Sequence, residues 1–125
     1  MQVEKFYNES FSEIAKALQA LSHPARLQVI EHLARYEECP AGEISNELPL
    51  SKSTVSQHMT KLREAGLIYC HQKGISQYYR LNYEKLSEVI QQIELFSGHI
   101  THLHKTKKVC KNLEPKIKRE KRIGT

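Results

Sequence analysis

The fold is decided by residues 41–81, which read AGEISNELPLSKSTVSQHMTKLREAGLIYCHQKGISQYYRL. In the first half of this stretch, apolar residues recur at intervals of three and four, a spacing typical of amphipathic helices. Pro40 suits the start of a short helix over residues 41–48, and Pro49 stops that helix. A second helix is expected over residues 52–65, so the stretch predicts two helices joined by a tight turn.

Single residues indicate where the second helix starts and where it ends. Ser51 can accept a hydrogen bond from the first free amides of the helix. Gly66 ends the helix, because a left-handed backbone conformation costs glycine nothing sterically. Val55, Met59 and Leu62 are spaced by four and three residues, so we expect them to face the core.

A β-hairpin is expected directly after the second helix. Aromatic and β-branched residues gather in residues 67–72 and 75–81, and Lys73-Gly74 supplies the turn between them. Tyr79 is expected to be buried. The chain therefore predicts a helix-turn-helix followed by a wing, the hairpin over residues 67–81.

Two helices are expected before this helix pair. The first can be capped by a serine within residues 10–12 and ends at Ser22-His23. Pro24 suits the first position of the next helix, which runs to about Tyr36. The inward face of that helix is expected to consist of Leu27, Ile30 and Leu33.

A long last helix from about Tyr83 carries apolar residues on one side as far as Leu103. Together with the apolar stripe of the first helix, this side exceeds what a small helical core would bury, and pairing of two chains would cover both. The expected fold class is mostly α with a small β-hairpin: a dimeric winged helix-turn-helix with a long C-terminal helix.

The outward face of residues 52–65 carries hydrogen-bonding side chains, and an acid, Glu64, comes only at its far end. Such groups can enter the major groove and bond to base edges and phosphates without charge repulsion. A solvated polar face is the simpler interpretation of an isolated helix, but the position before a hairpin with a basic tip favours DNA. The candidate DNA-binding residues are Ser51, Lys52, Ser53, Thr54, Ser56, Gln57, His58 and Lys61 of the helix and Lys73 and Arg80 of the wing.

Charge is divided unevenly along the chain. The 19 lysines and arginines exceed the 14 acids, which gives a formal charge of +5 and points to a polyanionic partner. Residues 105–122 sum to +7, so the remainder sums to −2. We expect a DNA-binding and dimerisation domain over residues 1–104 and a basic, flexible tail over residues 105–125 that adds non-specific affinity for double-stranded DNA.

Three blocks of the chain resemble the signature blocks of ArsR/SmtB-type winged-helix regulators. They are residues 20–27 (ALSHPARL), 51–59 (SKSTVSQHM) and 62–68 (LREAGLI), and residues 78–81 (YYRL) are similar to the close of the family's wing. The resemblance implies a homodimeric repressor that binds a two-fold-symmetric operator. In many members of the family, the repressor leaves the operator when an inducer binds.

The resemblance also implies where cysteines of an inducer site would lie. Metal-sensing members place a Cys-x-Cys at the start of the third helix, where this chain has Pro40 and Gly42, and only Cys39 lies nearby. One thiolate does not make a site for a soft ion. The second-helix position of thiol-sensing members falls near Glu31, although Cys39 and Cys110 could approach each other.

A second metal site of the family is matched only in its later half. His99 and His102 are spaced as ligands on one side of a helix, whereas Leu86 and Glu88 stand at the earlier positions. A metal-responsive repressor that uses these two histidines therefore stays an alternative to solvated histidines. No metal ligand, cofactor or inducer is assigned.

Other classes of protein fit the sequence less well. There is no Gly-x-Ser-x-Gly, no phosphate-binding glycine loop, no His-Glu-x-x-His and no aspartate, so an enzyme is not expected. There is no apolar run of about 18 residues and no secretory leader, and the three cysteines are widely spaced, so a cytoplasmic protein without membrane contact is expected. A winged-helix module for protein contacts is the remaining alternative.

Overall fold

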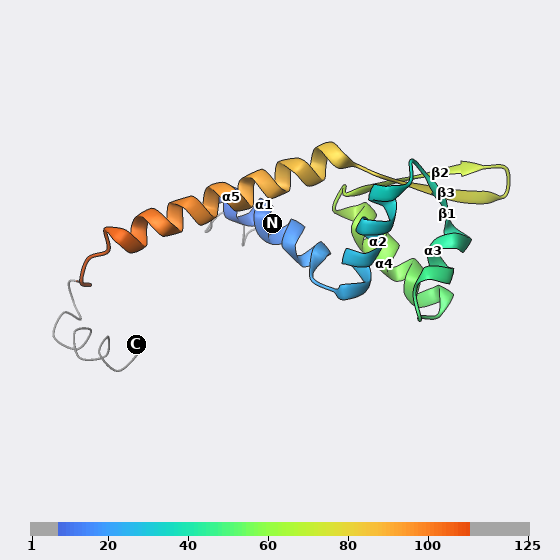
Figure 1. The fold of residues 1–125 in the computed structure, drawn as a ribbon, viewed down its shortest axis with the longest axis horizontal. Helices are drawn as coiled ribbons and strands as arrows, with labels where there is room; N and C mark the ends of the chain where they lie inside the picture. Colours follow the sequence, from blue (N-terminus) through green and yellow to red (C-terminus); the bar gives the residue numbers. More distant parts are fainter. Residues whose placement is uncertain (1–7, 111–125) are drawn as a thin grey trace. The chain divides into compact units, whose positions relative to one another are not determined.

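Five helices and three strands follow one another within residues 8–110, the part of the chain that the computed structural model describes (Figure 1). The helices are α1 (Glu9–Leu21), α2 (Pro24–Arg35), α3 (Ala41–Glu47), α4 (Lys52–Glu64) and α5 (Tyr83–Lys105). The strands are β1 (Cys39–Pro40), β2 (Ile68–Lys73) and β3 (Ser76–Leu81). The predicted fold class, mostly helical with a small hairpin, is confirmed.

The chain divides into two compact units, Met1–Ile93 and Glu94–Thr125, and α5 contributes to both. The expected division into residues 1–104 and 105–125 stays a prediction. Most of the basic tail, residues 111–125, lies outside the described residues.

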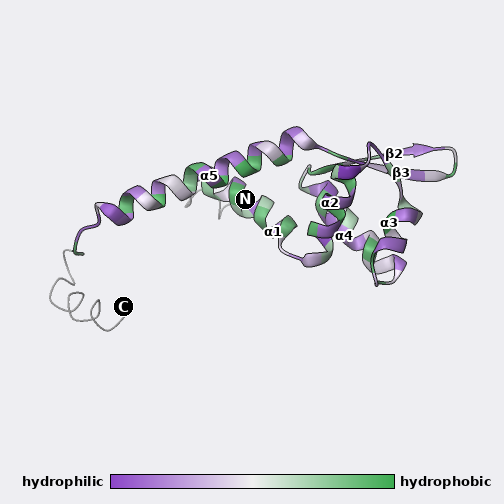
Figure 2. Cartoon of the chain, viewed as in Figure 1, coloured by the Kyte–Doolittle hydropathy of each residue, from purple (hydrophilic) through white to green (hydrophobic). Residues whose placement is uncertain are grey.

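The hydrophobic core of the first unit gathers residues from α2, α3, α4 and β2. Its most deeply buried large side chains, each at most 2% exposed, are Val29, Ile44, Leu62, Leu67 and Ile68. Val55 and Met59 are buried beside Leu62, as the spacing along α4 predicts. Figure 2 shows hydrophobic and hydrophilic residues interspersed along each helix, as expected of helices that bury one side.

The sheet has three antiparallel strands in the order β1-β3-β2. This is one strand more than the two of the predicted hairpin. Tyr79 of β3 pairs with Cys39 of β1 on one side and with Cys70 of β2 on the other. Tyr79 is buried, as predicted. The sequence does not indicate β1, because two residues ending in a proline carry no strand pattern, and proline is tolerated there only at a sheet edge.

The turn of the hairpin lies one residue later than predicted, at Gly74 and Ile75. Gly74 has a φ of +62°, and no residue other than glycine has a positive φ among the described residues. This combination is typical of a type II′ turn, in which glycine takes the first central position. Ile75 is therefore not part of a strand, and its side chain is 99% exposed at the wing tip.

The ends of α4 form as predicted. The Ser51 hydroxyl oxygen accepts a hydrogen bond from the Thr54 amide at 3.2 Å. At the other end, Gly66 has a φ of +78°, its amide donates to the Arg63 carbonyl, and the Leu67 amide donates to the Leu62 carbonyl. These two bonds form a Schellman motif, which satisfies carbonyls that the end of the helix would leave free.

Two details of the first two helices differ from the prediction. Asn8 caps α1 by accepting from the Ser10 amide, so neither Ser10 nor Ser12 is the cap. In α2, Val29 is buried and Leu27 is 54% exposed, because the inward stripe has a spacing of four residues. Two residues correspond to about 200° around a helix, which turns Leu27 away from the side that Val29 buries.

Burial of Leu62 and exposure of Leu27 predict unequal effects of the same substitution. Leu62→Ala removes a fully buried side chain and should lower the free energy of unfolding by about 2–5 kcal/mol, because it leaves a cavity. The matched variant Leu27→Ala should cost less than about 1 kcal/mol. Urea unfolding followed by circular dichroism measures both, and equal losses would contradict the burial described above.

Candidate DNA-binding surface

The outward side of α4 exposes most of the side chains that the sequence indicates. Lys52, Ser53, Ser56, Gln57 and Lys61 are all exposed. Both basic residues in the last turn, Lys61 and Arg63, lie where a positive charge interacts favourably with the helix dipole. The structure therefore brings together on one helix two lysines and several short or amide-bearing side chains.

Two of the predicted contact residues are engaged within the start of α4. The Ser51 hydroxyl donates to Thr54 Oγ1 at 2.9 Å, in addition to accepting from the Thr54 amide. Thr54 is also half-buried. Ser51 and Thr54 therefore stabilise the start of the helix, and the exposed side chains of Lys52, Ser56 and Gln57 are better placed to reach a ligand.

His58 is not on the outward face, contrary to the sequence-based expectation. Its side chain is 8% exposed, its Nδ1 lies 3.0 Å from Arg26 Nη1, and its ring centroid lies 4.3 Å from that of His23. Burial, with smaller contributions from His23 and Arg26, lowers the pKa of His58. Because the guanidinium can only donate, Nδ1 accepts the hydrogen bond, which favours the neutral imidazole.

A hollow of about 270 Å³ lies between α3, α4 and β3. Lys52 and Ser56 line it from α4, Ser45 from α3 and Gln77 from β3. Gln77 is exposed and accepts a hydrogen bond from the Tyr79 hydroxyl at 3.3 Å. Sequence reasoning missed Gln77, because its place beside α4 depends on the register of β3.

The two predicted wing cations both lie over aromatic rings. Lys73 Nζ is 5.0 Å from the centroid of Tyr78, and the guanidinium of Arg80 is 4.8 Å from the centroid of Tyr69. Stacking of this kind holds a cation in place while leaving its charge available. Lys73 and Arg80 are exposed, so both can reach a ligand from the wing.

Glu38, which precedes β1, contacts two basic side chains of the wing, and its position there is not indicated by the sequence. It forms an ion pair with Lys73, and its Oε2 lies 3.1 Å from His71 Nε2. The Lys73 hydrogen bond lowers the pKa of Glu38, and Glu38 in turn raises the pKa of Lys73. A phosphate that binds Lys73 would therefore have to compete with this carboxylate.

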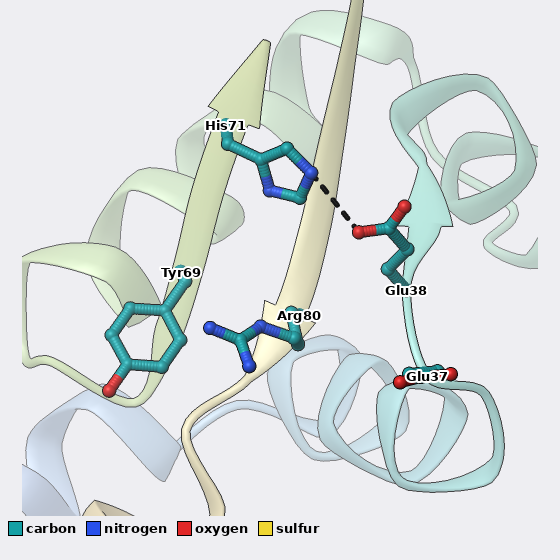
Figure 3. A pocket seen from close by; sticks show the side chains of 5 residues that line it. All are labelled: Glu37, Glu38, Tyr69, His71 and Arg80. Atoms are coloured by element: carbon teal, nitrogen blue, oxygen red, sulfur yellow. Dashed lines mark ion pairs between the residues drawn. The ribbon is translucent and has the colours of Figure 1, made fainter. Parts of the chain in front are cut away.

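An open pocket of about 650 Å³ adjoins this ion pair, and its lining residues are Glu37, Glu38, Tyr69, His71 and Arg80 (Figure 3). In Figure 3, His71 and Glu38 point toward each other, and the Arg80 guanidinium lies beside the Tyr69 ring. The carboxylates and the cations offset each other here, so the pocket itself is not a simple anion-binding site.

Comparisons with known proteins agree with this architecture. A family model described as a helix-turn-helix domain matches residues 21–70. The transcriptional repressor PagR of Bacillus anthracis is 30% identical over 82 residues, which cover 66% of this chain and 82% of PagR. The arsenical resistance operon repressor of Staphylococcus aureus is 29% identical over 105 residues, which cover 84% of this chain and 95% of that protein.

The chain belongs to the ArsR-type family of helix-turn-helix transcriptional regulators. Its fold matches that of an ArsR-like transcriptional regulator from Rhodococcus sp. RHA1, with a TM-score of 0.68 at 21% identity over 79% of this chain and 92% of the other. The predicted family and winged-helix fold are thereby confirmed. The similar proteins are regulators, a non-enzymatic class. Among the helices of residues 8–110, none has the length and apolar character of a membrane-spanning segment.

Two of the ArsR-type sequence blocks meet in the structure. Residues 20–27 contain His23 and Arg26, and residues 51–59 contain His58, which these two side chains contact. His23 also caps α2 by accepting from the Ala25 amide at 3.0 Å. These two family-like blocks are far apart in the sequence, but in the structure they form one cluster that joins α2 to α4.

The candidate inducer residues are not members of that cluster. His99 and His102 are exposed on α5, and Glu88 of the same helix lies 3.6 Å from the ammonium group of Lys85. All three cysteines are free: Cys39 is buried, Cys70 is half-buried and Cys110 is exposed. A sensing role for His99, His102 or Cys110 stays a prediction.

The lowered pKa of His58 predicts an acid-sensitive contribution to stability. The unfolded chain binds this proton near the ordinary value of 6.5, whereas the folded chain resists it, so stability is full above that pH and decreases as the pH falls through it. His58→Gln keeps an acceptor for Arg26 and should lose less stability between about pH 7.5 and about pH 5.5. Glu38 contributes only in a lower window, because its pKa lies below 4.5.

Urea unfolding at a series of pH values measures this difference. His104→Gln, on an exposed position of α5, is the matched control and should keep the pH dependence of the unsubstituted protein. An identical pH dependence in His58→Gln and the unsubstituted protein would contradict the role assigned to the buried ring.

Proposed function

We propose that this ArsR-type chain is a homodimeric repressor that binds a two-fold-symmetric operator, with α4 in the major groove and the wing beside it. The observation that carries the proposal is the outward side of α4, where lysines and hydrogen-bonding side chains are exposed and Glu64 is the only acid of the helix. Side chains of this kind can bond to base edges and phosphates alike. The named repressors among its relatives support the same function.

The exposed residues divide into two roles by their chemistry. Lys52, Lys61, Lys73 and Arg80 carry charge and are suited to phosphates, whose contacts give affinity without sequence preference. Ser56 and Gln57 lie further along α4 and are suited to base edges, because their hydroxyl and amide groups can both donate and accept.

Exposed apolar side chains support pairing with a second copy of the chain. In α1, Leu18 is 46% exposed. In the part of α5 that belongs to the second unit, Ile100 and Leu103 are 45% and 46% exposed. Ile100 and Leu103 are three residues apart and so lie on one side of α5, and exposed apolar side chains of this kind are typical of surfaces that pack against another helix. Two-fold pairing would place two copies of α4 about one turn of duplex apart, or about 34 Å.

Substitutions in α4 and the wing should separate affinity from sequence preference. Lys52→Ala and Lys73→Ala should weaken binding to all duplexes alike and reduce the salt dependence, because each removes about one phosphate contact. Gln57→Ala should instead bring the affinities for operator and random DNA closer together. Fluorescence anisotropy with self-derived promoter DNA and random DNA at several salt concentrations measures both effects.

Glu38→Gln provides an internal check on the same measurement. It removes the acid that competes for Lys73 and should act in the opposite direction to Lys73→Ala, strengthening binding to all duplexes. Absence of any salt-dependent binding to either DNA at low salt would overturn the proposal and favour a winged-helix module for protein contacts.

Charge introduced into the apolar stripes should separate the dimer. Leu18→Lys and Leu103→Lys each place a charge in a surface that pairing would bury, so the mass of the species should fall from two chains to one at micromolar concentration. Ile75→Lys at the wing tip is the matched control, because Ile75 is 99% exposed and lies outside both stripes. Sedimentation equilibrium gives the mass, and a two-chain mass in both stripe variants would contradict the assignment.

A further inference from the structure

Three side chains with metal-ligating atoms meet where α2, β1 and α3 come together. His32 of α2 places its Nε2 3.0 Å from the Sγ of Cys39 in β1, and that sulfur lies 4.0 Å from Oε1 of Glu43 in α3. One ligand atom from each residue lies within 4.8 Å of the other two. Among the described residues, this is the one group of three His, Cys or acidic side chains that is arranged in this way.

We propose that His32, Cys39 and Glu43 bind a divalent cation of the zinc class, with a water molecule at the fourth position. Imidazole nitrogen, thiolate sulfur and carboxylate oxygen are the three ligand types that zinc takes in proteins. Three protein ligands and one open position are typical of zinc sites that are not purely structural. This site differs from the pattern looked for in the sequence, because its second and third ligands come from α2 and from inside α3.

The geometry needs only small side-chain movements to close around an ion. Bond lengths of about 2.0–2.3 Å place the ligands of a tetrahedral zinc site about 3.5 Å apart. The His32 nitrogen and Cys39 sulfur, 3.0 Å apart, would move apart by about 0.5 Å, and Glu43, which is exposed and can change rotamer, would move closer to the sulfur. Cys39 is 2% exposed and is held by its pairing with Tyr79, so the thiol supplies a fixed point.

The surroundings favour a cation. Burial raises the pKa of Cys39, and the nearby carboxylates of Glu43 and Glu47 raise it further. A small cavity of about 60 Å³ between α2 and α3 is lined by His32 and by the acids Glu31 and Glu47. This cavity gives water access to the histidine, and because Arg35 also lines it and pairs with Glu31, its net negative charge comes from Glu47.

A cation here would join three elements that position the helix pair. The ligands come from α2, from the strand that pairs with β3 of the wing, and from α3, the first helix of the pair. Without an ion, these elements are joined here by weak hydrogen bonds. A bound ion would add stronger links between them. Binding should therefore stabilise the folded protein, independently of whether DNA is present.

Cobalt(II) titration of the full reduced chain tests the site, because cobalt replaces zinc and reports thiolate ligation by an absorption band in the near ultraviolet. One equivalent should bind with this band, and zinc should displace it. Cys39→Ser should abolish the band, and Glu43→Gln should weaken binding by about tenfold, because an amide is a poorer ligand than a carboxylate. Glu43 is exposed, so this variant should fold even if His32→Ala does not.

Matched controls separate this site from the other candidates. Cys70→Ser, Cys110→Ser and the double variant His99→Ala/His102→Ala should all keep the cobalt band and the increase in melting temperature with zinc. Absence of cobalt binding, a band that survives Cys39→Ser, or a band lost in the His99/His102 double variant would overturn the proposal. None of these outcomes affects DNA binding by the metal-free chain, so the two proposals can fail separately.

Discussion

The arrangement of the helices depends on Arg26, near the start of α2. Its Nε donates to the Ala20 carbonyl at 2.7 Å, and its Nη2 donates to the Gln19 carbonyl at 3.4 Å, so the guanidinium satisfies carbonyls at the end of α1. A cation at the C-terminal end of a helix also interacts favourably with the helix dipole. The remaining nitrogen, Nη1, contacts His58 in α4 at 3.0 Å. One side chain thus links the end of α1 to the middle of the helix whose outer side would meet DNA.

Asn82 provides a second link, at the end of α4. Its amide nitrogen donates to the Gly66 carbonyl at 2.9 Å, and its backbone amide donates to the Leu67 carbonyl at the same distance. Its side-chain oxygen accepts from the Lys85 amide at 3.1 Å and so caps the first turn of α5. The end of α4, the end of the wing and the start of α5 therefore share one residue. Together, Arg26 and Asn82 hold α4 near its middle and at its end. The outward side of α4 takes no part in these contacts.

The features that could be predicted from the sequence are those that depend on neighbouring residues. Ser51 and Gly66 end α4 as expected, because capping and left-handed glycine act within one turn of the chain. The position of His58 could not be predicted, because its burial depends on Arg26, 32 residues earlier. The contacts of Glu38 were missed for the same reason: only the sheet places it beside the wing cations. Long-range pairing therefore determines which of the predicted DNA-binding residues are free to contact DNA.

The same long-range pairing determines which positive charges can bind a phosphate freely. Lys73 lies in the first unit, but it pairs with the half-buried Glu38, so its contact with a phosphate would exchange one anion for another. Lys52 and Lys61 lie on the outward side of α4, where a phosphate could bind them without displacing the Glu38 carboxylate. Lys73 is held in place by Glu38 and the Tyr78 ring, and Arg80 by the Tyr69 ring, so Lys73 would add less affinity than a lysine of α4. Affinity from this unit would come mainly from α4, and the discrimination between sequences would come from the uncharged side chains between its lysines.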